Sequence, residues 1–169
     1  MKVSQLPGLA ELQSMFDYDP ATGLLTWKAK KRGRQIGEAG GIRRIGKQTY
    51  RYVKIDYRSY GAHRLVWKIV TGEDPVGWID HQDNNGLNNR WSNLRSASSA
   101  QNNHNRRLST RNTSGVKGVS WDALHKSWRV VVMVNYKNHF LGYFPNVEDA
   151  TRVAYVERER LHGEFARYI

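Results

Sequence analysis

The chain has 169 residues, no cysteine and a formal charge of +12, with 27 Lys and Arg against 15 Asp and Glu. The missing cysteines exclude disulfides and thiolate metal sites, so any bound metal must take oxygen or imidazole ligands. The charge favours a polyanionic partner, and nucleic acid is the leading candidate. A basic surface without a specific partner is the simpler alternative.

The length allows one ordinary domain or two to three very small ones. Apolar residues make up 39% of the chain and the mean hydropathy is −0.71, as in a globular protein in water. No apolar run is long enough to span a membrane, and residues 1–7 lack the apolar segment of a secretory signal. We therefore expect a cytoplasmic protein without a membrane partner.

Residues 9–16 have the apolar spacing of a short helix that stops at Asp19-Pro20. Residues 23–28 and 49–56 read as strands of a small sheet. The basic, glycine-rich connector between them can follow DNA phosphates or simply keep a loop in water. We favour phosphate contact by its arginines, which are Arg32, Arg34, Arg43 and Arg44.

Residues 62–72 have helical spacing with a glycine stop, and residues 78–81 resemble a short strand. A polar loop follows over 82–90, after which Ser92 or Asn93 is positioned to cap a helix that runs towards Asn102. Residues 106–114 are polar and basic, as in a linker, and three of their arginines could also lie along a DNA groove: Arg106, Arg107 and Arg111.

The last segment contains three short strands, at 116–121, 127–135 and 139–144. A helix follows, with Asn146 as its N-cap and Gly163 as its stop. Its apolar stripe is Ala150, Val153, Ala154 and Leu161.

Asp80 and His81 are the candidate centre of the chemistry. Hydrolysis of a phosphodiester needs an activated water and stabilisation of the charge that develops, which a histidine and a divalent ion can supply. Neighbours on a strand face opposite sides, so one of the pair can bind a metal while the other faces a phosphate. A hard ion, Mg²⁺ or Mn²⁺, would take the Asp80 carboxylate and an amide oxygen from the later helix. In the simpler reading, both residues belong to a surface turn.

The stretch Asp80-His81-Gln82-Asp83-Asn84-Asn85-Gly86-Leu87-Asn88-Asn89-Arg90-Trp91-Ser92-Asn93-Leu94-Arg95, with Gln101-Asn102-Asn103 beyond, resembles HNH endonucleases of the phage and intron homing type. The similarity extends back to His63-Arg64-Leu65-Val66 and to residues 16–28. If a phage encodes the chain, the cytoplasm would be that of a bacterial host.

The resemblance implies a ββα-metal core in which His81 is the general base and Asp80 and Asn102 bind the metal. It also implies that Asn93 holds the His81 ring by a hydrogen bond. Some members have histidine as the last ligand, so Asn103 and His104 compete with Asn102. His63 and Arg64 are candidates for phosphate contact or for packing beneath the site. Three tryptophans are expected in the core: Trp67, Trp78 and Trp91.

Residues 114–167 resemble an AP2-type DNA-binding domain, in the segments Ser114 to Trp121, Lys126 to Val130, Leu141 to Phe144, Glu148 to Ala150 and His162 to Arg167. The resemblance implies a three-stranded sheet, backed by one helix, that enters the major groove. Trp128 and Arg129 face opposite sides, so we expect Trp128 in the core and Arg129 on DNA. The candidates for DNA contact are Lys117, Trp121, Lys126, Trp128, Arg129 and Lys137.

The sequence thus predicts an α+β protein with a β-rich DNA-contacting region at 1–60, the HNH core at 61–105, a linker at 106–114 and an AP2-like domain at 115–169. It predicts a metal-dependent endonuclease that nicks or cleaves duplex DNA at a preferred site. The alternatives are a non-cleaving DNA-binding regulator and, least favoured, an RNA-directed protein. The target sequence and the oligomeric state are not encoded in these patterns.

Overall fold

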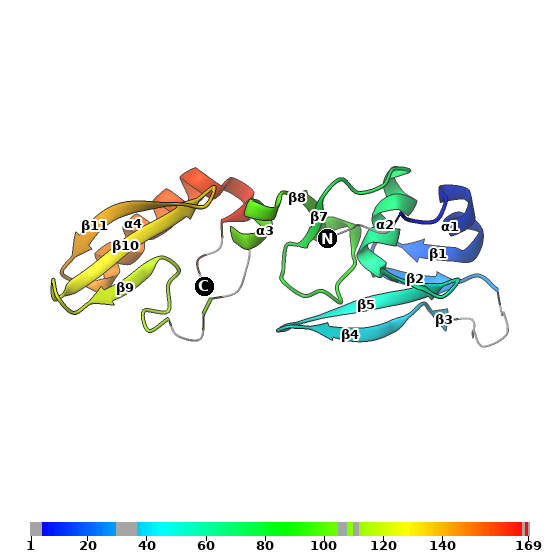
Figure 1. Cartoon of the computed structure of the whole chain (residues 1–169), viewed down its shortest axis with the longest axis horizontal. Helices are drawn as coiled ribbons and strands as arrows, with labels where there is room; N and C mark the ends of the chain where they lie inside the picture. The colour runs from blue at the N-terminus through cyan, green and yellow to red at the C-terminus, as the bar shows by residue number, and fades with distance from the viewer. Residues whose placement is uncertain (1–4, 30–36, 105–107, 110–111, 167, 169) are drawn as a thin grey trace. The chain divides into compact units, whose positions relative to one another are not determined.

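The computed structural model describes residues 5–29, 37–104, 108–109, 112–166 and 168, apart from the side chains of Asn103 and His104. The chain divides into two compact units, Met1–Ser96 and Ala97–Ile169. Both combine helices with small antiparallel sheets (Figure 1), so the predicted α+β class is confirmed. Within the described ranges, no helix is long and apolar enough to cross a membrane.

The described residues of the first unit form three small sheets. Their strand orders are β1-β2-β3, β4-β5-β6 and β7-β8. The elements are α1 (Leu9–Met15), β1 (Phe16–Asp19), β2 (Leu24–Trp27), β3 (Gly37–Glu38), β4 (Gly41–Ile45), β5 (Gln48–Ile55), β6 (Arg58–Gly61), α2 (Ala62–Thr71), β7 (Trp78–His81), the 3₁₀ turn η1 (Trp91–Asn93) and β8 (Leu94–Ala97).

The predicted helices and strands of this unit are confirmed where hydrophobic periodicity was clear. α1 ends at Met15, before the predicted stop at Asp19-Pro20, because Phe16 turns to an extended backbone and begins the strand β1. Phe16 pairs with Trp27, and their ring centroids lie 4.3 Å apart. α2 ends at Gly72, whose φ of 82° is in the left-handed region that glycine adopts without strain. The short strands β1, β4 and β6 carry too little apolar pattern to be predicted from the sequence.

One hydrophobic core serves the whole unit and draws on buried residues from Leu6 to Leu94. Val53 and Ile55 of β5 are buried together with Leu65 and Val66 of α2. The described residues before position 61 and residues 61–96 therefore pack around a common interior. The division of roles expected at residue 60 stays a prediction.

Two of the three tryptophans expected in the core are found there. Trp67 and Trp91 pack against the core, with ring centroids 5.1 Å apart. The prediction is wrong for Trp78, which is 47% exposed. Trp78 begins β7, and only the residues that follow it in the strand are buried.

The β1–β2 hairpin lies directly against the backbone of the polar loop. The hydroxyl of Tyr18 donates to the carbonyl oxygen of Asn89 at 2.8 Å, and the Trp91 amide donates to the Pro20 carbonyl oxygen at 3.3 Å. At Gly23 the approach is so close that a Cβ would lie 2.4 Å from the amide nitrogen of Arg90. The N-terminal hairpin thus supports the loop that follows β7.

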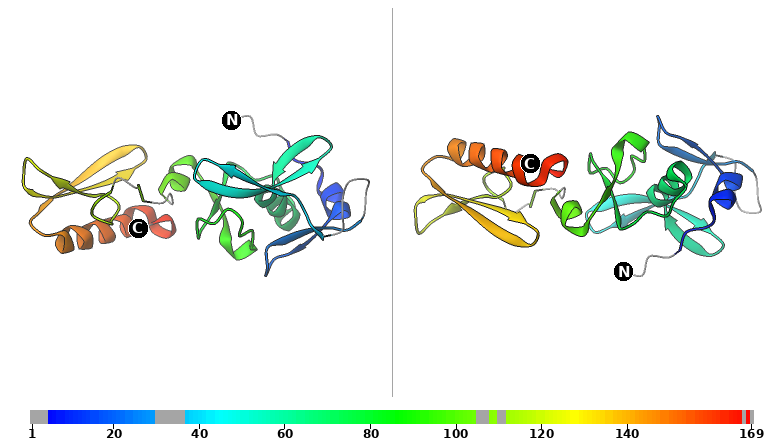
Figure 2. Two further views of the ribbon diagram at one scale, coloured as in Figure 1. Left: turned by 90° about the horizontal axis from the view of Figure 1, so that it is seen from below. Right: turned by 90° about the horizontal axis from the view of Figure 1, so that it is seen from above.

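The second unit is a three-stranded antiparallel sheet backed by one helix (Figure 2). Ala150 and Ala154 of the helix are buried in one cluster with Val119 and Val130 of the sheet. The elements are α3 (Ser99–His104), β9 (Val119–Asp122), β10 (Ser127–Val134), β11 (Lys137–Phe144), α4 (Val147–His162) and the 3₁₀ turn η2 (Gly163–Phe165), and the sheet order is β11-β10-β9.

The predicted ends of α4 and the two faces of β10 are confirmed. Asn146 caps the helix by accepting from the Asp149 amide at 2.8 Å, and Gly163 follows its last residue. Trp128 packs against the core, whereas Arg129 is exposed with its guanidinium 5.9 Å from the centroid of the Phe140 ring. The three strands and the helix correspond to those that the sequence predicted, but β9 begins at Val119 instead of residue 116 and β11 at Lys137 instead of residue 139.

Replacement of Gly23 by alanine should destabilise the first unit by about 2 kcal/mol, because Gly23 has a φ of 79° and no room for a Cβ. Urea unfolding measures the loss. Gly8→Ala is the matched control, because its φ is −57° and a Cβ there would meet nothing within 4 Å. Equal midpoints for the two variants would contradict the close approach of the hairpin to the loop.

Candidate active site

A group of buried polar side chains extends from β7 through the loop to η1. Each of its members has between 3% and 8% of its surface exposed. Polar groups buried to this extent need hydrogen-bond partners, because an unpaired one loses its hydration without compensation. The group consists of Asp80, His81, Asn84, Asn89 and Asn93.

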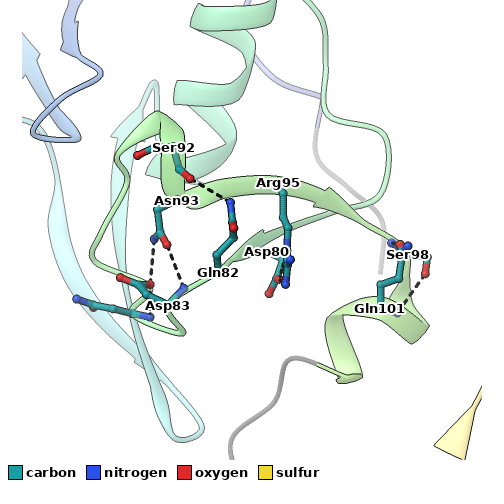
Figure 3. Close-up of polar contacts among 9 residues, drawn as sticks. Asp80, Gln82, Asp83, Ser92, Asn93, Arg95, Ser98 and Gln101 are labelled. Carbon is teal, nitrogen blue, oxygen red and sulfur yellow. Dashed lines mark hydrogen bonds and ion pairs between the residues drawn. The ribbon is translucent and has the colours of Figure 1, made fainter. Parts of the chain in front are cut away.

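The side chain of Asn93 holds the loop closed (Figure 3). Its amide nitrogen donates to Oδ1 of Asp83 at 2.9 Å and to the carbonyl oxygen of Asn88 at 2.8 Å. Its amide oxygen accepts from the backbone N–H of Asp83 at 3.0 Å. The backbone takes part as well, since the Gln82 amide donates to the Asn93 carbonyl oxygen at 2.9 Å.

Asp83 is the acceptor at the centre of this loop. Its carboxylate also accepts from the side chain of Asn88 at 2.7 Å and from the backbone N–H of Asn85 at 2.8 Å. Burial by itself raises the pKa of Asp83, but these hydrogen bonds outweigh it and hold the pKa below its usual value. The ionised carboxylate therefore organises the loop.

The His81 ring is positioned by Asn89, whose amide oxygen lies 3.2 Å from Nε2. Because Asn89 presents an oxygen, Nε2 carries the proton of the neutral ring, and the lone pair is on Nδ1. Burial lowers the pKa of His81, against the opposing effects of the Asn89 bond and of Asp83 and Asp80. The ring is thus kept in the neutral form that a general base requires.

Asn89 takes the role that the sequence analysis expected of Asn93. Both N–H groups of the Asn93 amide are directed to Asp83 and Asn88, so they do not hold the His81 ring. Asn93 instead fixes the loop that carries Asn89. The consecutive asparagines at 88 and 89 gave no indication of which one would turn inward.

Asp80 pairs with Arg95 of β8, a residue that the sequence analysis did not single out. Nε and one terminal nitrogen of Arg95 each lie 2.9 Å from the same carboxylate oxygen (Figure 3). The side chain of Arg95 is only 11% exposed and that of Asp80 only 6%. The guanidinium compensates the charge of a carboxylate that burial would otherwise disfavour.

The Asp80 carboxylate is a ligand of the kind that a hard divalent ion accepts. Among the residues that the structure describes, however, no three His, Asp or Glu side chains are grouped to hold a metal. Any ion here would need amide oxygen or water to complete its ligands.

His63 and Tyr50 complete the surroundings of His81. The His63 and His81 rings meet edge to face, with centroids 5.2 Å apart, and the Tyr50 ring lies 5.8 and 5.9 Å from the two. Nδ1 of His63 is buried, and none of the described residues forms a hydrogen bond with it. Burial, aided by the charges of His81 and Arg64, lowers the pKa of His63 to about 3.

The segment from Ser92 to Asn102 differs from the prediction of one helix. η1 is followed by the strand β8, and a separate helix α3 begins only at Ser99. Leu94 and Ala97 are buried at the ends of β8, and a reciprocal cap between Ser98 and Gln101 starts α3. Asn102 lies on α3 in the second unit, so its partnership with Asp80 stays a prediction.

The residues expected on DNA have varied surroundings. Arg64 donates to the carbonyl oxygens of Gly77 and Pro75 and so supports the connection between α2 and β7. Arg43 and Arg44 are exposed on β4. Lys126, Arg129 and Lys137 are exposed in the second unit, Trp121 is 49% exposed, and Lys117 is half-buried. The other expected arginines lie outside the described residues: Arg32, Arg34, Arg106, Arg107 and Arg111.

Comparisons with known proteins relate part of this chain to a nuclease family. Residues 60–104 match the HNH endonuclease family. Protein 3.8 of Escherichia phage T7 is 38% identical over 115 residues, which cover 66% of this chain and 93% of that protein. An uncharacterised HNH endonuclease of Acanthamoeba polyphaga mimivirus is 34% identical over 124 residues, covering 72% of this chain and 63% of the relative. No solved structure matches.

The matched range begins at Tyr60 in β6 and contains the whole group from Asp80 to Asn93. The chain therefore belongs to the same family as protein 3.8 of phage T7, and its residues 60–104 are an HNH endonuclease domain, which marks it as a nuclease at the level of the family.

Proposed function

We propose that the chain is a metal-dependent endonuclease of the homing type that cuts duplex DNA at a preferred site. The observation that carries the proposal is the neutral, buried ring of His81, held by Asn89 next to the buried carboxylate of Asp80. A fixed ring with a low pKa suits the removal of a proton from water at neutral pH.

In this proposal His81 takes the proton of the attacking water through Nδ1, since Nε2 is directed to Asn89. Asp80 and Asn102 would hold Mg²⁺ or Mn²⁺, which would stabilise the charge that develops on the phosphate. Arg95 keeps the Asp80 carboxylate in a fixed orientation. One such site cuts one strand in each engagement, so a monomer would nick.

The DNA would be held by exposed cations in both units. Arg43 and Arg44 lie on β4, whose residues are all exposed, and Arg129 lies on the exposed side of β10. The sheet and helix of the second unit suit an AP2-like reader of the major groove. The T7 relative supports a role in the cytoplasm of a bacterial host.

Substitution of His81 by alanine should slow the cleavage of supercoiled plasmid at least about 100-fold, because the water loses its base. The assay contains Mg²⁺ or Mn²⁺, with chelator as the metal-free condition. Val76→Ala, at a side chain that is 89% exposed on the connection before β7, should cut like the parent. A His81→Ala variant as fast as the parent would refute the assignment of the base. Parent protein that binds DNA but never cuts would favour the regulator instead.

Substitution of Asn93 by alanine should release the loop, because three side-chain hydrogen bonds are lost. We expect amide exchange at Asp83 to speed up at least about tenfold and cleavage to slow. Ser92→Ala is the neighbouring control, because the Ser92 side chain is exposed and the bond from Gln82 reaches its backbone oxygen. Unchanged exchange at Asp83 would contradict the role given to Asn93.

Substitution of Arg129 by alanine should weaken binding to duplex DNA and lower the slope of log affinity against log salt by about one, as expected for one lost phosphate contact. Arg152→Ala removes the same charge from an exposed position on α4, where the arginine pairs with Asp149, and serves as the control. Equal losses in the two variants would show a general charge effect and count against the sheet as the DNA-contacting surface.

A further inference from the structure

His63 is a second histidine beside His81 that the proposed mechanism leaves without a task. It is the second residue of α2, and its ring lies edge-on to that of His81. The ring's Nδ1 is buried without a hydrogen-bond partner in the part of the chain that the structure describes. A buried N–H without an acceptor is among the rarest features of folded proteins, whereas a lone pair without a donor costs less. The proton of the neutral His63 ring therefore belongs on Nε2.

The backbone before α2 leaves room for this ring. A Cβ on Gly61 would lie 2.6 Å from Cε1 of His63 and 3.2 Å from each ring nitrogen. Gly61 has φ −66° and ψ 129°, a conformation open to any residue. A side chain at position 61 would therefore collide with the imidazole of His63, although the backbone angles there would allow one.

The Tyr50 ring packs against both imidazoles and holds His63 and His81 side by side. Tyr50 contacts both, and its own ring is packed so closely on the polar loop that a Cβ on Gly86 would lie 2.5 Å from it. The two imidazole centroids are 5.2 Å apart. Because a hydrogen bond reaches about 3 Å beyond each ring, both rings can meet oxygens of a single phosphate group.

The nitrogen of His63 that is able to meet a ligand is Nε2. Nδ1 is closed off from solvent, while the residue as a whole is only half-buried. With the proton on Nε2, this nitrogen is a neutral hydrogen-bond donor. Such a donor suits an anionic oxygen whose charge grows during the reaction.

We propose that His63 is a second catalytic imidazole, which donates through Nε2 to a non-bridging oxygen of the phosphodiester whose attacking water His81 deprotonates. The inference rests on the proposed nuclease function and adds to it a second histidine with the opposite task. His81 accepts a proton from water, whereas His63 keeps its proton and stabilises the oxygen that gains charge.

Two substitutions separate donation from packing. His63→Phe keeps an aromatic ring without a donor, and we expect kcat for plasmid cleavage to fall about 100-fold with KM changed less than about threefold. His63→Gln places an amide N–H near the position of Nε2 and should recover about tenfold of the loss. Val70→Ala, on the exposed side of the same helix, should cut like the parent. Cleavage by His63→Phe at the parental rate would overturn the proposal.

A second measurement does not depend on cutting. ¹⁵N NMR of the parent, with a short duplex DNA and chelator, should show the Nε2–H signal of His63 moving downfield as DNA is added, because the proton gains a phosphate acceptor. An unmoved signal with DNA bound would overturn the proposal even if His63→Phe were impaired, since the ring would then serve only packing. If the parent never cuts, the nuclease function fails, and this measurement alone decides whether His63 meets phosphate.

Discussion

The polar side chains between Asp80 and Asn93 are buried, and each must find a partner inside the protein. The side-chain amide of Asn93 supplies several of these partners, because it bonds to the side chain and backbone of Asp83 and to the backbone of Asn88. These contacts fix the shape of the loop, and the loop in turn carries Asn89 to the ring of His81. A change in this hydrogen bonding would therefore alter the orientation of the His81 ring as well as the stability of the unit.

The same loop explains why the N-terminal hairpin belongs to the nuclease unit. The hydroxyl of Tyr18 donates a hydrogen bond to the backbone oxygen of Asn89, and the backbone of Arg90 lies against Gly23. The second strand of the next sheet adds Tyr50 to the imidazoles. Elements that the sequence analysis assigned to DNA contact thus also form the wall of the site, and the two tasks are compatible because β4 leaves Arg43 and Arg44 exposed.

Helix ends and strand faces could be predicted from the sequence because neighbouring residues determine them. The glycine stop of α2, the Asn146 cap of α4 and the two faces of β10 follow from residues within a few positions of one another. Asp80 and His81 were predicted from a resemblance in one continuous stretch. Arg95 and Tyr50 were missed because they reach the site only through the pairing of strands and the packing of sheets. The strand β8 was mistaken for helix because capping residues precede it, yet its burial is decided by the core.

Asp80 precedes His81 in the chain and His63 contacts its ring, and these two side chains are accommodated in the interior in different ways. The Asp80 carboxylate has a guanidinium nitrogen of Arg95 at 2.9 Å, and this cation compensates the carboxylate charge in the interior. His63 is neutral, and no described residue bonds to its buried Nδ1. The protein thus provides Arg95 as a partner for Asp80, whereas the neutral His63 ring has no charged partner of this kind among the described residues. The site therefore has one further donor beside His81, the Nε2–H of His63, for which an oxygen of a phosphodiester would be the acceptor.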